Sequence, residues 1–193
     1  MPKPSSAAKR PGKREVRKLL ETLSKEQLVD ELMRMHDDFA QVREYLSMRV
    51  SPDDTAVREK YKRIIGKEFS FSWTRSPRVS IARKAVQDYR KVAASAEGVA
   101  DIMMYYVEQV EAYTADLGGD EGLYSSAGRM YLDAVKHIAQ HELQDRFRER
   151  SRRLAHTRHG YGFSDLVMDL HMAWFEGADP EELDEEDELS GDA

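Results

Sequence analysis

The most apolar stretch of the chain runs from residue 99 to residue 117, and it constrains the fold more than any other segment. Large side chains recur there at intervals of three or four residues, which places them on one side of a helix. The first half is also apolar on the opposite side, a pattern typical of a helix enclosed by its neighbours. We therefore expect a central helix that begins near Ser95 and ends at Gly118-Gly119. Its buried stripe comprises Val99, Ile102, Met103, Tyr106, Val110, Tyr113 and Leu117.

Amphipathic patterns predict further helices on both sides of this stretch. A Ser24–Gln27 capping box begins a helical segment that reaches residue 50, either as one helix or as two helices hinged near Asp37-Asp38. The remaining helices are expected over about 13–23, 53–66, 76–93, 120–138, 142–159 and 163–174. The stripe of the last helix is Phe163, Leu166, Val167, Leu170 and Trp174.

Residues 69–75 interrupt the helical pattern, because aromatic and hydroxyl side chains alternate there. The chain offers no second strand-like run to pair with them, so we expect an extended connector that holds Phe69, Phe71 and Trp73 between helices. The predicted fold is all-α, a compact array or bundle of about seven to nine helices without a sheet. A disordered basic arm (1–12), a single helical domain (13–176) and a disordered acidic tail (177–193) are expected.

The charged residues are distributed unevenly along the chain. Residues 1–18 contain seven Lys/Arg and one Glu, whereas residues 176–193 contain ten Asp/Glu and no Lys/Arg. Between the ends, residues 58–91 are mainly basic and residues 97–145 mainly acidic, which predicts a basic face and an acidic face. The sequence has no cysteine, no apolar run of membrane-spanning length and no secretory h-region, so we expect a cytoplasmic protein without disulfides.

The basic region around the aromatic connector is a candidate binding surface. Cations would hold phosphates and aromatic rings would stack on unpaired bases, as in a nucleic-acid groove. Alternatively, the rings belong to the core and the cations are solvated or paired with the acidic central face. The candidate residues are Lys62, Arg63, Lys67, Trp73, Arg75, Arg78, Arg83 and Lys84.

A second candidate site lies on the helix predicted after residue 120. His137 and His141 are four residues apart and therefore share one side of that helix, a spacing that suits a divalent metal ion. Glu108 and Glu111 of the central helix would supply further ligands. Alternatively, the histidines are ordinary surface or half-buried residues. No H-E-x-x-H, phosphate-binding glycine loop or dinucleotide fingerprint occurs in the sequence, and we expect no cofactor.

Several segments, taken in order, resemble a bacterial domain-of-unknown-function family of small helical proteins. The resemblance spans about residues 13–150 and implies a helical domain, but it gives no catalytic or binding residues to transfer. The segments are KREVRKLLETLSKEQLVDEL, KYKRIIGKEF, SIARKAVQDYRK, ADIMMYYVEQVEAYT and YLDAVKHI.

The sequence as a whole favours a non-enzymatic intracellular binding module with a basic face. We expect a protein partner, with nucleic acid as the other class of partner and no membrane contact. The alternative function is a metal-dependent enzyme centred on His137 and His141. The oligomeric state does not follow from the sequence.

Overall fold

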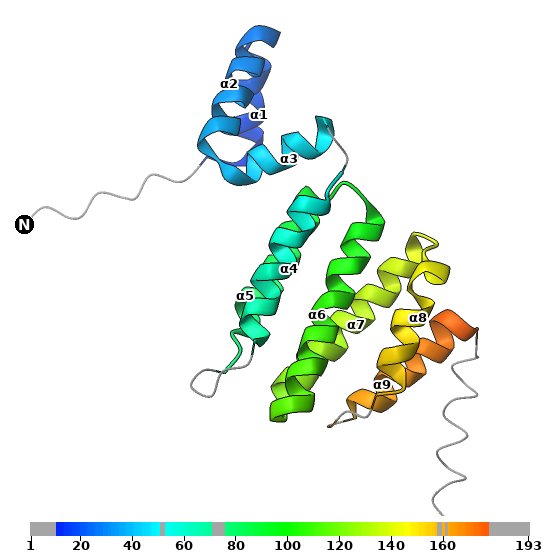
Figure 1. Cartoon of the computed structure of the whole chain (residues 1–193). Coiled ribbons are helices and arrows are strands. Elements are labelled where there is room, and N and C mark those ends of the chain that lie inside the picture. Colours follow the sequence, from blue (N-terminus) through cyan, green and yellow to red (C-terminus); the bar gives the residue numbers. More distant parts are fainter. Residues whose placement is uncertain (1–10, 51–52, 71–75, 158–159, 161, 178–193) are drawn as a thin grey trace, which may run out of the picture. The chain divides into compact units, whose positions relative to one another are not determined.

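The computed structural model describes residues 11–50, 53–70, 76–157, 160 and 162–177. Within these ranges every regular element is helical and none is a strand, which confirms the all-α prediction (Figure 1). The elements are α1 (Lys13–Glu21), α2 (Lys25–Asp38), α3 (Ala40–Val50), α4 (Thr55–Phe69), α5 (Val79–Val92), α6 (Ala96–Leu117), α7 (Glu121–Gln140), α8 (Gln144–Ala155), α9 (Phe163–His171) and the π-helical turn η1 (Met172–Glu176).

The chain divides into two compact units, residues 1–46 and residues 47–193. We call them the N-terminal unit and the C-terminal unit and describe each separately. The prediction of a single domain over 13–176 stays a prediction. The basic arm and the acidic tail lie almost entirely outside the described residues. Among the helices in the described ranges, none is both long and apolar enough to cross a membrane.

The C-terminal unit is organised around α6 and α7. Helices α4 and α5 pack against α6, while α8 and α9 pack against each other and against α7 (Figure 1). Ile102, Met103 and Met104 of α6 are all fully buried. Because consecutive residues of a helix point about 100° apart, neighbours enclose this half of α6 on all sides, as its sequence predicts.

Helix α7 provides the other half of the core. Its N-cap Asp120 accepts a hydrogen bond from the Leu123 amide at 2.8 Å. The Ser95 hydroxyl caps α6, as the sequence predicts, by accepting from the Gly98 amide at 3.0 Å. Gly118 ends α6 with a φ of 73°, a conformation that glycine adopts without strain. The apolar side of α7 is buried along its whole length, at Leu123, Ala127, Met130, Tyr131, Ala134, Val135 and Ile138.

Helix α4 is longer than predicted, because it continues past Gly66 to Phe69. A β-carbon at Gly66 would lie 2.9 Å from the Tyr105 hydroxyl, so the glycine permits a close helix contact and does not end the helix. The ring of Phe69 packs edge-on against Tyr106, with centroids 5.6 Å apart. Phe69 is therefore a buried helix end and no part of a connector, whereas Phe71 and Trp73 lie outside the described residues.

Two other boundaries differ from the sequence prediction. Helix α5 begins at Val79, since Arg78 has a non-helical ψ of 77°, so Pro77 does not occupy the first helical position. In the last helix Leu166 and Trp174 are exposed, contrary to the predicted stripe, while His171 and Phe175 are buried. The π-helical turn adds residues per turn after His171 and thereby directs Phe175 inward in place of Trp174.

The N-terminal unit contains the predicted capping box and a break. The Gln27 amide donates to the Ser24 hydroxyl at 3.2 Å, and the Ser24 amide donates to the Gln27 side chain at 2.9 Å. Of the two alternatives for residues 25–50, the structure has two helices, separated at Phe39 by an extended backbone. Among the described residues of α1, α2 and α3, none is buried.

This contrast in burial predicts that truncating a side chain has a large effect on stability in the C-terminal unit and almost none on α1. Ile102→Ala should lower the free energy of unfolding of the C-terminal unit by about 2–5 kcal/mol, because it leaves a cavity beside α6. Leu19→Ala on α1, where the side chain is 62% exposed, should change it by less than about 0.5 kcal/mol. Urea unfolding followed by far-UV circular dichroism measures both; equal losses would contradict the assignment of the core.

Candidate functional site

The predicted basic face is largely paired with carboxylates. The Lys62 ammonium lies 2.7 Å from Asp101 of α6. The Arg78 guanidinium donates two hydrogen bonds to Glu68, at 2.9 and 2.8 Å, and Lys84 pairs with the carboxylate one turn further along α5. These three cations are therefore paired with carboxylates, but only Lys62 pairs with the acidic central helix, because the partners of Arg78 and Lys84 are on α4 and α5.

The other predicted members of that face are distributed over two helices. Arg63 and Lys67 are exposed on α4, and Arg83 is half-buried on α5. Trp73 and Arg75 lie outside the described residues. The structure therefore does not assemble the eight side chains into one described groove, and their role in nucleic-acid binding stays a prediction.

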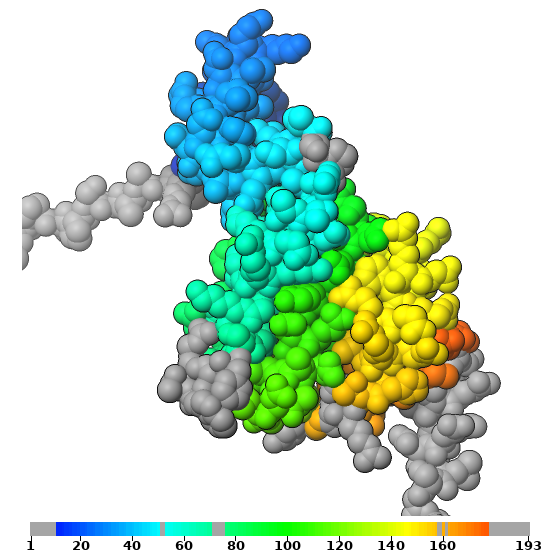
Figure 2. Space-filling model, viewed as in Figure 1, coloured from blue at the N-terminus to red at the C-terminus, as the bar shows by residue number. Residues whose placement is uncertain are grey.

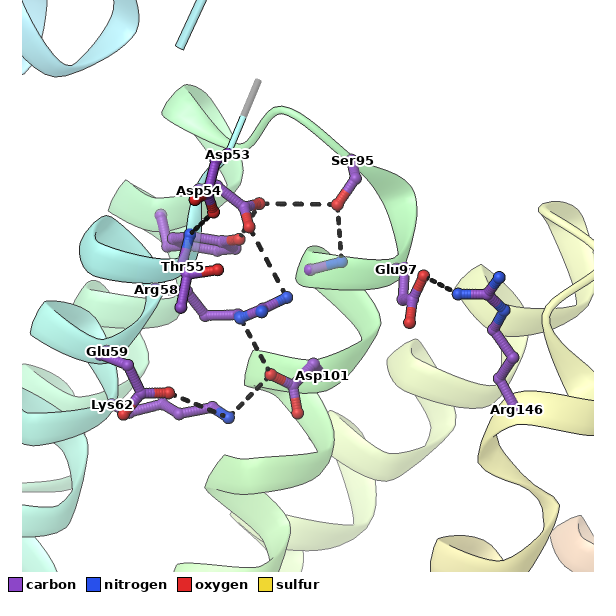
Figure 3. Close-up of polar contacts among 12 residues, drawn as sticks. Asp53, Asp54, Thr55, Arg58, Glu59, Lys62, Ser95, Glu97, Asp101 and Arg146 are labelled. Atoms are coloured by element: carbon purple, nitrogen blue, oxygen red, sulfur yellow. Dashed lines mark hydrogen bonds and ion pairs between the residues drawn. The ribbon is translucent and has the colours of Figure 1, made fainter. Parts of the chain in front are cut away.

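The most concentrated set of charges surrounds Asp101, near the start of α6. Its carboxylate, which is 17% exposed, lies 2.6 Å from Arg150 Nη1 of α8 and 2.7 Å from Lys62 Nζ of α4. Arg58 Nε of α4 is 3.3 Å away (Figure 3). One carboxylate thus joins three helices, and we call these residues and their direct partners the Asp101 network.

The network extends in two directions from Asp101. Arg150 also donates two hydrogen bonds to Glu108, each 2.8 Å long, in the bidentate geometry that a guanidinium favours. On the other side, Arg58 lies 3.6 Å from Asp54, whose carboxylate accepts a 2.5 Å hydrogen bond from the Tyr89 hydroxyl. At the α6 N-terminus, Glu97 pairs with Arg146 as a separate contact between α6 and α8 (Figure 3).

The pKa values within the network follow from its burial and hydrogen bonds. Burial by itself raises the pKa of Asp101, but hydrogen bonds from Lys62 and Arg150 outweigh burial and hold this pKa below its ordinary value. Burial and the bond to Asp54 both raise the pKa of the Tyr89 hydroxyl, which stays protonated. Asp101 is therefore held charged and Tyr89 neutral, which suits a structural link between helices better than proton transfer.

A surface groove of about 800 Å³ adjoins this network between α6 and α8. Figure 2 shows the side chains of α8 (yellow) beside α6 (green) on this face. The groove is lined by both signs of charge, since Glu111 faces it together with Arg153 and His156. Arg152 on its rim pairs with Glu149 at 2.6 Å. This balance of charges gives the groove no preference for an anion or a cation.

The predicted metal site is not assembled. The rings of His137 and His141 are neighbours, with centroids 4.4 Å apart, but His137 Nε2 lies 3.0 Å from the Ala96 carbonyl oxygen. Glu108, expected as a ligand, is bound on both oxygens by Arg150. In the part of the chain that the structure describes, no group of three or more His, Asp or Glu side chains is placed to hold a metal ion. Burial lowers the pKa of His137, consistent with a half-buried structural histidine.

A polar chain inside the C-terminal unit was not predicted from the sequence. The Tyr131 hydroxyl lies 2.5 Å from Ser151 Oγ, which lies 2.8 Å from His171 Nδ1. His171 Nε2 is 3.5 Å from Glu176, at the end of η1. Ser151 is fully buried, so no substrate reaches its hydroxyl, and the chain connects α7, α8 and α9 without forming a nucleophilic site. The i,i+4 spacing of His171 after Val167 was the available signal that it faces inward.

The Asp101 network predicts a strong effect of one neutral substitution. Asp101→Asn should destabilise the C-terminal unit by about 2–4 kcal/mol, because it leaves three half-buried cations without their shared carboxylate. Glu149→Gln removes an exposed pair and should cost less than about 1 kcal/mol. Since the folded pKa of Asp101 is lowered, the difference between wild type and Asp101→Asn should be complete near neutral pH and shrink as the pH falls below 3.8. A pH-independent difference in urea midpoints would contradict this assignment.

The buried histidine predicts that the C-terminal helices loosen in acid. Burial lowers the pKa of His171 in the folded unit. In the unfolded chain this side chain binds a proton at about pH 6.5, whereas in the folded unit it binds the proton only at a lower pH. Stability from neutral His171 is therefore present above pH 6.5 and is lost as the pH falls below it. Hydrogen exchange of residues 163–177, corrected for intrinsic rates, should quicken several-fold between about pH 8 and about pH 5.5. His171→Gln should abolish this dependence and His141→Gln should keep it.

Comparison with known proteins places the chain in a family. Residues 11–159 match the description "Family of unknown function (DUF6155)", a range that includes α1 to α8 and ends before α9. Searches of curated proteins and of solved structures returned no match. This match covers more than half of the sequence. The chain therefore belongs to the family of unknown function DUF6155, in agreement with the resemblance of its helical segments.

Proposed function

We propose that this chain is a protein-interaction module and that its N-terminal unit is the binding element. The observation that carries the proposal is the exposure of large apolar side chains on helices that bury none of their residues in the described part of the unit. Isolated helices of this length are marginally stable in water, and they gain stability when an apolar face is covered. The exposed side chains are Val16, Leu19, Leu20, Val29, Leu32, Met33, Met35, Phe39 and Tyr45.

The spacing of these residues suits a helical partner. On α1 the sequence places Val16, Leu19 and Leu20 three or four residues apart, and on α2 Leu32 and Met35 continue a similar step toward Phe39. Such i, i+3 and i+4 anchors are the pattern by which amphipathic helices dock on one another. The partner surface is therefore expected to present apolar side chains from one or more helices.

Charge favours a protein over a nucleic acid at this unit. Helix α2 carries five Asp/Glu and two Lys/Arg, which repels phosphates along its length. In the C-terminal unit, the pairing of Lys62, Arg78 and Lys84 with carboxylates reduces the charge available to a phosphate backbone. A surface that combines apolar side chains with charges of both signs is typical of a protein interface.

Photo-crosslinking tests the proposal directly in the full chain. A benzophenone amino acid in place of Leu32, which is 48% exposed on α2, should crosslink to a second polypeptide in cells that produce the protein. The same group in place of the exposed Lys136 of α7 is the matched control and should give little product. Adding Leu19→Asp should lower the Leu32 yield about tenfold or more, since loss of one apolar anchor costs more than about 1.4 kcal/mol.

Mass spectrometry of the products distinguishes the outcomes. Peptides from a second polypeptide joined at position 32 support the proposal. If position 32 is joined only to residues of the C-terminal unit of the same chain, that unit covers the N-terminal unit; this result, or the absence of any product with a second polypeptide, would overturn the proposal.

A further inference from the structure

We infer that Met33 and Met35 of α2 are a site of reversible oxidation, and that conversion of their thioethers to sulfoxides weakens binding at the N-terminal unit. The inference rests on the proposed function and specifies a regulation of that same surface. The oxidant is a peroxide. One oxygen atom passes from hydrogen peroxide to the sulfur, so the S–O bond forms, the O–O bond breaks, the thioether is oxidised by two electrons and the peroxide is reduced to water.

Exposure singles out these two methionines. Met33 is 51% exposed and Met35 is 36% exposed, whereas every other methionine within the described ranges is buried or half-buried. Those other methionines are Met48, Met103, Met104, Met130, Met168 and Met172. Since an oxidant must reach the sulfur atom, peroxide should modify α2 first. The chain has no cysteine, so no thiol competes for the oxidant.

Both methionines lie beside the apolar side chain that is proposed to anchor the partner. Consecutive residues of a helix are rotated by about 100°, which places Met33 on one side of Leu32 and Met35, three residues on, on the other. Met33 also follows the exposed Val29 by four residues, and Met35 precedes the exposed Phe39 by four. A partner that covers Leu32 therefore also covers at least one of the two sulfur atoms.

Oxidation changes what this surface can bind. A thioether is apolar and flexible and suits contact with other apolar side chains. A sulfoxide is polar, and water solvates its oxygen in the free chain. An apolar partner surface removes that water and offers no hydrogen-bond donor in exchange. Sulfoxides on both sides of Leu32 should therefore weaken binding about tenfold or more.

The modification can be reversed without new synthesis of the chain. Methionine sulfoxide reductases return the sulfoxide to the thioether, and one enzyme acts on each of the two sulfoxide epimers. The electrons come from a dithiol, which becomes a disulfide while the oxygen leaves as water. Met33 and Met35 would thus respond to both the peroxide and the dithiol supply of their surroundings.

Oxidation before crosslinking tests the inference in the full chain. The chain with benzophenone at position 32 is treated with hydrogen peroxide, freed of peroxide by catalase, mixed with a dialysed lysate of cells that produce the protein, and irradiated. Peptide mass spectrometry should find one added oxygen atom at Met33 and at Met35 well before any at the buried Met103 and Met104. The yield of product with a second polypeptide should fall about tenfold or more. Both sulfoxide reductases with dithiothreitol should restore it.

Two double variants isolate the responsible sulfur atoms. Met33→Leu with Met35→Leu keeps apolar side chains of similar volume and removes both thioethers. This variant should crosslink like the wild type before oxidation, and peroxide should leave its yield unchanged. Met168→Leu with Met172→Leu changes two half-buried methionines of the C-terminal unit and is the matched control. It should lose its crosslink on oxidation as the wild type does.

The outcomes separate this inference from the proposed function. If the untreated chain crosslinks to a second polypeptide and the oxidised chain does so equally, control by oxidation is wrong and the interaction module stands. An equal loss in the wild type and in Met33→Leu with Met35→Leu would assign the effect to another residue and also overturn the inference. If even the untreated chain gives no product with a second polypeptide, both are overturned.

Discussion

Enclosure of the first half of α6 is the constraint on which the C-terminal unit depends. A helix that is apolar on every side can leave water only if neighbours surround it, so α4, α5 and α7 must all pack against it. Close approach is possible because glycine at position 66 of α4 accommodates the Tyr105 hydroxyl of α6. The arrangement of these helices therefore follows from a single strongly apolar segment and one well-placed small residue.

The same enclosure makes a charged side chain on α6 energetically unfavourable, and the Asp101 network compensates for this cost. Asp101 lies within the most apolar half of α6, where an unpaired carboxylate would be strongly unfavourable. Cations from α4 and α8 surround it, so the charge is neutralised by the helices whose positions it links. Arg150 reaches across from α8 to both Asp101 and Glu108, and its long side chain joins helices whose backbones make few direct contacts. The network therefore accounts for three cations, Arg58, Lys62 and Arg150, whose charges are already paired within the fold.

The two units differ in what they offer to other molecules. In the C-terminal unit most large apolar side chains are buried and most charged side chains have partners within the unit. Its polar groups also pair internally, as in the buried chain from Tyr131 through Ser151 to His171. In the N-terminal unit, by contrast, Leu19, Leu20 and Leu32 are exposed, and several charges have no partner within the described ranges. A surface with unsatisfied apolar and charged groups is the part of a protein that gains most from an interface. Family membership supplies no activity, so this asymmetry is the strongest guide to function.

Local sequence patterns determined the helices and much of the core. The period of Ile102 and Met103, the caps at Ser24, Ser95 and Asp120, and the stripe of α7 depend on interactions within a few residues, which the sequence displays directly. Only the tertiary structure decided which charges meet. Lys62 and Arg150 are 88 positions apart in the chain, and no local pattern shows that both bind Asp101. Likewise, only the tertiary structure shows that Glu108, an expected ligand beside His137 and His141, is bound by Arg150, and that Trp174 faces solvent because a π-helical turn changes the register. Helix formation is a local property of the chain, whereas the partner of a charged side chain depends on which helices pack together.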